Sequence, residues 1–200
     1  NLAGQMVTAS DANDQIDALG TAISEPRLNT QQLNLFGDGE YGSTTDSASL
    51  DLTTTATWEL WGNFYDTVAI NQFVFSKYSS TISDRSWAFD KYTADPAGRL
   101  RFTLGDPVDG SFEFTGRFLV PDQVSCIQVT FNSGSLVCYV NGVATGITTL
   151  NGAIPSVLRV SSAPVTVGSI NSPAYFFTDN KIGSTKIYNR ALTADEVLTN

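Results

Sequence analysis

Short segments that alternate apolar and polar residues, each followed by a turn signal, repeat along this chain from Leu33 onward. A period of two places every second side chain on one face of a strand, and β-branched and aromatic residues favour that conformation. Turn-forming pairs such as Ser133-Gly134 and Asn141-Gly142 separate the segments. The predicted strands are 33–36, 48–52, 56–64, 72–78, 86–92, 99–104, 111–118, 125–131, 136–140, 157–160, 164–169 and 181–188. About a dozen strands between turns predict an all-β fold, either a sandwich or a barrel.

The N-terminal stretch, residues 1–32, does not share this pattern. Ile16, Leu19 and Ile23 have helical spacing, which predicts one short amphipathic helix. An extended arm is the alternative, because Asn, Asp and Gly are dense in this stretch. We therefore divide the chain into an N-terminal arm, residues 1–32, and a sandwich domain, residues 33–200.

A short helix is predicted at the other end of the chain. Thr193 is followed three residues later by Glu196, which is the spacing of a capping box. Before it, Tyr188 and Leu192 are apolar anchors, and Arg190 between them can donate to a carboxylate or to carbonyls. We interpret this closing segment as structural.

The two cysteines lie in a predicted hairpin. If Ser133-Gly134 form its two-residue loop, Val129 faces Cys138. Strand alternation then places Cys126 on the opposite face, with its sulfur pointing away from that of Cys138. A disulfide between them is therefore not expected, and both are interpreted as small buried or half-buried thiols.

The balance of charges excludes several classes of function. The chain has 20 acidic and 11 basic side chains and no histidine, which gives a net charge of −9 and a pI near 4.3. Without histidine there is no Ser-His-Asp triad, no Cys-His pair and no histidine metal ligand. Nucleic acids and anionic membranes both need a positive field, so neither is expected as a partner. The apolar runs are far too short for a membrane-inserted helix.

Several motifs follow one another in an order typical of a known family. They are Phe36-Gly37-Asp38-Gly39-Glu40-Tyr41, Ala56-Thr57-Trp58-Glu59-Leu60-Trp61, Phe75-Ser76-Lys77, Cys138-Tyr139-Val140-Asn141-Gly142 and the closing KIGSTKIYNRALTADEV from Lys181 to Val197. In this order they resemble laminin-G-like domains of the concanavalin A-like lectin and glucanase superfamily. The resemblance implies a jelly-roll sandwich of two curved antiparallel sheets, and it does not cover residues 1–32.

A calcium site is implied by the same resemblance, because the family brings two acidic loops together. In this chain those loops carry Asp38 and Glu40, and Asp179 just before the closing strand. Carboxylate oxygens are the ligands that Ca²⁺ prefers, so a structural Ca²⁺ at these residues is the one cofactor expected. The alternative is turn chemistry without a metal, since Asp in Gly-Asp-Gly bonds to its own backbone.

Glycoside hydrolysis on such a fold needs two carboxylates flanking the sugar bond. The related glucanases carry them in an E-x-D-x-x-E pattern, and none of the five glutamates here begins that pattern. Glu59 shares a strand face with Trp61, either as part of a sugar platform or as a half-exposed pair. We therefore expect a protein that is not an enzyme, with a glycoside hydrolase as a remote alternative.

Aromatic residues are the candidate ligand-binding groups, because aromatic rings stack on sugar faces. Trp61, Tyr65, Trp87 and Tyr175 are predicted to contact ligand, and Tyr65, Trp87 and Tyr175 are expected to be the most exposed. The alternative is that most of these rings fill the core of the sandwich.

Two classes of function fit these observations. The first is an extracellular, cell-surface or virion-surface module that binds carbohydrate. The second is a structural block of a virion or cell-surface assembly, in which residues 1–31 dock on neighbouring subunits. The expected partner is thus a glycan or another protein subunit.

Overall fold

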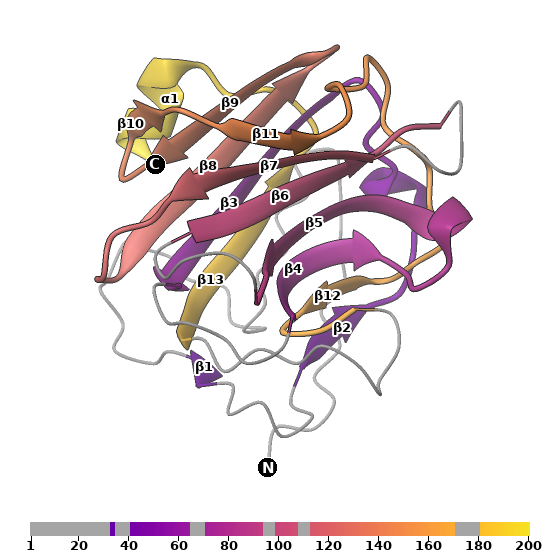
Figure 1. Cartoon of the computed structure of the whole chain (residues 1–200), viewed down its shortest axis with the longest axis horizontal. Coiled ribbons are helices and arrows are strands. Elements are labelled where there is room, and N and C mark those ends of the chain that lie inside the picture. The colour runs from indigo at the N-terminus through magenta and orange to yellow at the C-terminus, as the bar shows by residue number, and fades with distance from the viewer. Residues whose placement is uncertain (1–32, 35–40, 65–70, 94–98, 108–112, 171–180) are drawn as a thin grey trace.

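The structure is a computed structural model that describes residues 33–34, 41–64, 71–93, 99–107, 113–170 and 181–200 (Figure 1). Within these residues the chain forms a six-stranded sheet, a seven-stranded sheet and one C-terminal α-helix, with antiparallel pairing throughout. The predicted all-β sandwich of two antiparallel sheets is confirmed. No helix in this part of the chain is long and apolar enough to cross a membrane.

The six-stranded sheet has β3 and β8 at its centre. Its strand order is β1 (Leu33–Asn34), β13 (Lys181–Tyr188), β3 (Thr55–Asn63), β8 (Ser125–Asn132), β9 (Ser135–Val140) and β10 (Val143–Thr145). Helix α1 (Ala194–Thr199) follows β13 and lies near β9 and β10 in Figure 1.

The seven-stranded sheet forms the other layer. Its order is β11 (Thr148–Asn151), β7 (Glu113–Leu119), β6 (Arg99–Gly105), β5 (Arg85–Lys91), β4 (Gln72–Tyr78), β12 (Val165–Val167) and β2 (Gly42–Thr44). Two 3₁₀ helices, η1 (Ala48–Leu50) and η2 (Ile82–Asp84), lie in the connections.

Aromatic side chains from both sheets meet in the core between them. The Trp58 ring on β3 lies 5.5 Å from Trp87 and 5.0 Å from Phe102, and Phe89 lies 4.5 Å from Phe102. All four side chains are fully buried. Each stabilises the fold by about 1.5–3 kcal/mol or more through the apolar area removed from water.

The β8–β9 hairpin matches its prediction. Ser133 and Gly134 both have positive φ, at 43° and 90°, which is the conformation of a two-residue type I′ turn. Val129 pairs with Cys138 across the ladder, as predicted. Cys126 points to the other face. Both thiols are free and buried, and burial raises the pKa of Cys138 to about 12, so neither is a reactive thiolate.

Two predicted strands are wrong. In 48–52 the chain forms η1, which buries Leu50 through a turn whose Leu50 N–H donates to the Ser47 carbonyl at 2.9 Å. Residues 157–160 form a connection, because the N–H of Leu158 donates to the Thr53 carbonyl and that of Arg159 to the Gly105 carbonyl, which builds no ladder.

Strands β2, β10 and β11 were not predicted. They are three or four residues long, and β11 is exposed at every position. Without a buried face there is no apolar alternation from which such a strand could be recognised.

The closing segment and its helix cap match the prediction. Thr193 accepts a hydrogen bond from the Glu196 N–H at 3.3 Å, and Glu196 Oε2 accepts from the Thr193 N–H at 2.9 Å. Arg190 donates to the same carboxylate at 2.8 Å. Leu192 is buried against Val197, with Tyr188 packed beside them.

The capping box makes the stability of α1 depend on pH. The hydrogen bond from Arg190, followed by the Thr193 N–H, lowers the pKa of Glu196 from 4.5 to about 2. A depressed carboxyl pKa stabilises the folded state fully above pH 4.5, and this stabilisation is lost as the pH falls toward 2. We expect the amide protection of Val197 to decrease over that range, as measured by hydrogen exchange. In Glu196→Gln the decrease should disappear, and an unchanged pH profile in that variant would contradict the assignment.

Candidate functional site

The outer face of the seven-stranded sheet, turned away from the core, carries an unusual number of arginines. Strand β6 buries Leu100 and Phe102 in the core, so Arg99 and Arg101 point outward. Arg117 on β7 pairs directly with Arg101 and shares this face. Three of the chain's 11 basic residues therefore gather on two neighbouring strands.

One polar row crosses four strands on this face. Asp90 on β5 pairs with Arg101, Arg101 with Arg117, and Arg117 with Thr148 on β11. Directly paired residues have Cβ atoms about 4.5–5.5 Å apart, so the row is continuous.

The Asp90 end of the row is an ion pair held against an aromatic ring. Arg101 donates from Nε to Asp90 Oδ2 at 2.9 Å and also from Nη2 to the same oxygen. Its guanidinium lies 4.3 Å from the centroid of the Tyr92 ring. Asp90 is buried, whereas Tyr92 is 37 % exposed. The arrangement fixes a cation and an aromatic ring side by side at the surface.

The β4–β12 side of the same face is covered by the chain itself. Ser76 Oγ donates to the Ser169 carbonyl at 3.1 Å, and Ile170 packs with Phe73, Tyr78 and Ala88. Among the described residues, the accessible part of this face therefore lies over β6, β7 and β11.

A pocket of about 230 Å³ opens on that accessible part. Its lining consists of Arg99, Arg117, Phe118, Leu119, Thr145, Gly146 and Thr148. The two guanidinium groups come from β6 and β7, the two threonines come from β10 and β11, and Gly146 comes from the connection between β10 and β11.

That connection is held in place by a close approach to β7. A Cβ atom at Gly116 would lie 2.5 Å from Ile147 Cδ1, so a glycine is needed where the Ile147 side chain packs on the sheet. Ile147 packs against the core cluster, which anchors the segment that carries the pocket threonines.

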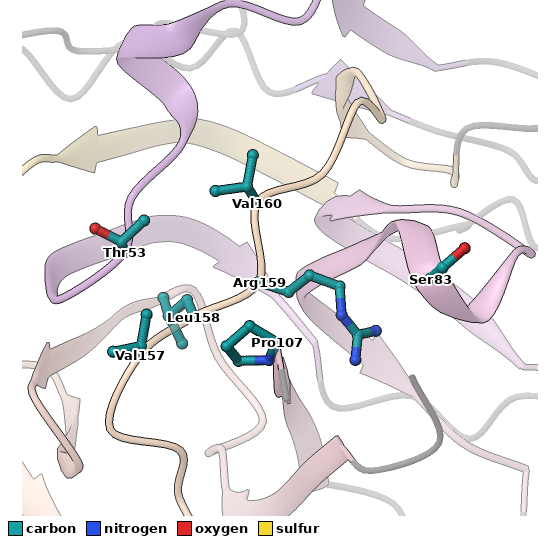
Figure 2. A pocket seen from close by; sticks show the side chains of 7 residues that line it. All are labelled: Thr53, Ser83, Pro107, Val157, Leu158, Arg159 and Val160. Atoms are coloured by element: carbon teal, nitrogen blue, oxygen red, sulfur yellow. The ribbon is translucent and has the colours of Figure 1, made fainter. Parts of the chain in front are cut away.

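A larger pocket of about 450 Å³ lies at the rim of the sandwich (Figure 2). Its lining is Thr53, Ser83, Pro107, Val157, Leu158, Arg159 and Val160. Arg159 donates from Nη1 to the Ile82 carbonyl at 2.5 Å and from Nη2 to the Asp106 carbonyl. Its guanidinium thus ties two loops together, and the remaining walls are mostly apolar.

The outer face of the six-stranded sheet holds a buried carboxylate, Glu59. It accepts hydrogen bonds from Trp61 Nε1 at 3.1 Å and Gln128 Nε2 at 3.0 Å, and pairs with Lys186 Nζ at 2.9 Å. Burial alone would lower the pKa of Lys186, but the Glu59 carboxylate outweighs it and the pKa is raised. Glu59 and Trp61 share a face as predicted, whereas the expected half-exposure of Glu59 is wrong because three donors cover it.

A buried cation lies near one end of the core. Lys77 is fully buried, and its Nζ contacts Asp46 Oδ1, the Ser161 carbonyl at 2.5 Å and the Ala163 carbonyl at 3.0 Å. Asp51 Oδ1 lies 3.5 Å away. Four protein oxygens therefore surround one ammonium group.

Of the four predicted ligand residues, the structure describes Trp61 and Trp87, which lie on different sheets. Trp61 is half-buried beside Glu59 on the six-stranded sheet. Trp87 was expected to be exposed, and this is wrong: alternation along β5 places it with Phe89 in the core, fully buried. Tyr65 and Tyr175 lie outside the described residues.

The predicted calcium ligands Asp38, Glu40 and Asp179 also lie outside the described residues, so calcium binding stays a prediction. Within the described part of the chain, no group of three or more His, Cys, Asp or Glu residues is placed to hold a metal. The arginines of the outer face were missed, although the spacing Arg99-Leu100-Arg101 already predicts two arginines on one face of a strand.

Comparison with known proteins identifies a family by sequence. A family described as the concanavalin A-like lectin/glucanases superfamily matches residues 36–198. No match was found among curated protein sequences.

Solved structures similar to this chain include binding domains of botulinum neurotoxins. The serotype D ligand binding domain in complex with N-acetylneuraminic acid has a TM-score of 0.62 at 11% identity, covering 94% of this chain and 45% of that one. The serotype D/C binding domain has a TM-score of 0.60 at 13% identity, with 86% and 44% covered. A DC binding domain in complex with SialylT has a TM-score of 0.55 at 12% identity, with 80% and 38% covered. This chain thus spans less than half the length of these neighbours, and the likeness is one of fold.

Proposed function

This chain belongs to the concanavalin A-like lectin/glucanase superfamily, and from that membership we propose that it is a non-enzymatic carbohydrate-binding module that faces the extracellular space. The observation that carries the proposal is the accessible outer face of the seven-stranded sheet, where Arg101 lies over the Tyr92 ring and pairs with Arg117, a residue that lines a pocket. A fixed cation, an aromatic ring and threonine hydroxyls are groups that bind sugar hydroxyls and sugar faces.

Two of the similar solved structures support this proposal, because they are binding domains in complex with sugar ligands. One of those binding domains is in complex with N-acetylneuraminic acid and another is in complex with SialylT. The match covers less than half of each of those proteins, so it does not identify which residues of this chain contact a sugar.

The proposal that this chain is not a glycosidase rests on Glu59, the carboxylate that shares a strand face with Trp61. Glu59 is buried and engaged by Trp61, Gln128 and Lys186. A glycosidase pair needs a second carboxylate roughly 5–9.5 Å away. Both oxygens of the Glu59 carboxylate are engaged by these donors and the side chain is fully buried, so it is not accessible to a sugar bond as one member of such a pair.

The proposal predicts that the intact chain binds at least one glycan on an array of immobilised neutral and acidic glycans. Tyr92→Ala removes the ring beside Arg101 and should weaken that binding about tenfold. Trp61→Ala is the matched aromatic truncation on the other sheet and should leave binding unchanged.

No glycan bound by the folded chain would contradict the proposal. Loss of binding in Trp61→Ala alone would move the site to the six-stranded sheet, where Trp61 is the predicted ligand residue. A structural role in which residues 1–31 dock on neighbours stays a prediction, because that segment lies outside the described residues.

A further inference from the structure

We infer that the 230 Å³ pocket formed by β6, β7 and the β10–β11 connection is an anion subsite that takes the carboxylate or sulfate group of an acidic sugar. The inference rests on the proposed carbohydrate binding and adds the chemical class of the ligand. It also places the charged group of the ligand next to Arg99 and Arg117.

The charge of the pocket is the first argument. Arg99 and Arg117 line it from neighbouring strands, and none of the described residues that line it is acidic. Arg117 pairs with Arg101, whose neighbour two residues back is Arg99, so the two pocket arginines are diagonal cross-strand neighbours. The side chain of Arg99 makes no ion pair or hydrogen bond with another described residue. In a chain with a net charge of −9, this is a local positive site.

The donor chemistry is the second argument. A guanidinium presents parallel N–H groups that match both oxygens of a carboxylate or sulfate. The hydroxyls of Thr145 and Thr148 lie at the same pocket and can donate to or accept from sugar hydroxyls. Leu119 is 62% exposed and gives the pocket an apolar edge for the C–H face of a sugar ring.

The shape of the pocket is the third argument. No atom lies within 4 Å of a Cβ built on Gly146, so the entrance beside this residue is open. A volume of 230 Å³ is below the roughly 300–1,000 Å³ of pockets that enclose a drug-sized ligand. It suits the terminal sugar of a larger glycan, with the remaining sugars outside along the outer face.

The acidity of the whole chain argues against polyanions as the ligand. Nucleic acids and anionic membranes carry negative charge that extends far beyond one pocket, and the net charge of −9 on this chain would repel them. A terminal acidic sugar presents one anionic group, to which Arg99 can donate locally.

The test compares three soluble probes by isothermal titration calorimetry with the intact chain. The probes are 3′-sialyllactose, which carries a carboxylate, a sulfated heparin-derived oligosaccharide, and neutral lactose. We expect one of the acidic probes to bind at least about tenfold more tightly than lactose, since a hydrogen-bonded charge contributes about 1.5–3 kcal/mol. The preferred acidic probe tells whether the site takes a carboxylate or a sulfate.

The variants locate the site. Arg99→Gln should weaken binding of the preferred acidic probe at least about tenfold, with the thermal midpoint unchanged because Arg99 is half-exposed and unpaired among the described residues. Arg190→Gln removes the same charge from an exposed arginine on the closing segment and should leave binding unchanged. Arg99→Lys keeps the positive charge but loses the paired N–H groups of the guanidinium, so its affinity for the preferred acidic probe should lie between those of Arg99→Gln and the original chain.

The failures of the two proposals are distinguishable. Equal binding of lactose and the acidic probes, or acidic binding that is unaffected by Arg99→Gln, overturns the anion subsite and leaves carbohydrate binding intact. No binding of any sugar, together with none on the glycan array, overturns both. Binding to phosphatidylserine vesicles or to a single-stranded oligonucleotide in place of sugars overturns the assignment of an acidic glycan.

Discussion

Lys77→Met is expected to destabilise the fold by about 3–5 kcal/mol, measured as the free energy of unfolding in urea. Lys77 is fully buried, and its ammonium is surrounded by Asp46, Asp51 and two backbone carbonyls. Methionine fills a similar volume but leaves these oxygens without a cation. The loss therefore comes from uncompensated carboxylates and carbonyls rather than from a cavity.

Two further variants separate this cause from simple packing. Lys77→Met combined with Asp46→Asn and Asp51→Asn removes the unpaired negative charges, so it should be more stable than Lys77→Met alone. Arg190→Met removes the cation from the exposed pair with Glu196 and should change the unfolding midpoint only slightly. If Lys77→Met unfolds at the same urea concentration as the original chain, the buried ammonium does not stabilise the fold.

Trp87→Ala is expected to cost about 3–5 kcal/mol of unfolding free energy, because it leaves a cavity where the ring packs on Phe75 and Trp58. In Trp87→Phe most of the ring volume is kept. The indole nitrogen of Trp87 is buried with no hydrogen-bond partner among the described residues, so phenylalanine removes no hydrogen bond. We expect this variant to lose much less stability.

The same variants test whether Trp87 contacts ligand. Trp87→Phe should bind glycan as the original chain does, since the ring lies in the core. Trp61→Ala should destabilise less than Trp87→Ala because Trp61 is half-buried on an outer face. Weaker glycan binding by a fully folded Trp87→Phe would mean that the ring reaches the ligand after all.

Features that depend on a few neighbouring residues could be predicted from the sequence. The turn at Ser133-Gly134 follows from a turn-forming pair between two alternating segments, in which Gly134 readily takes positive φ, and it then determines that Val129 meets Cys138. The cap formed by Thr193 and Glu196 likewise lies within one helical turn. Such signals are local, and the order of the family motifs linked them into the correct sandwich.

The candidate site depends on alignment between strands, which the sequence does not show. Arg101 and Arg117 are 16 positions apart, and they become neighbours only through the register of β6 and β7. The core position of Trp87, by contrast, could have been predicted. Alternation along β5 places Trp87 and Phe89 on one face, and Ser86 and Asp90 on the other.

The outermost strands of both sheets are very short. In the described part of the chain β1 has two residues, β2 and β10 have three each, and β11 has four. A free sheet edge is a template on which another chain can add a strand and begin to aggregate, and the length of the edge limits how many hydrogen bonds such an encounter can form. These edges give an incoming strand little to pair with. Many copies can therefore be concentrated without joining through their sheets, and contacts between them would have to use side chains.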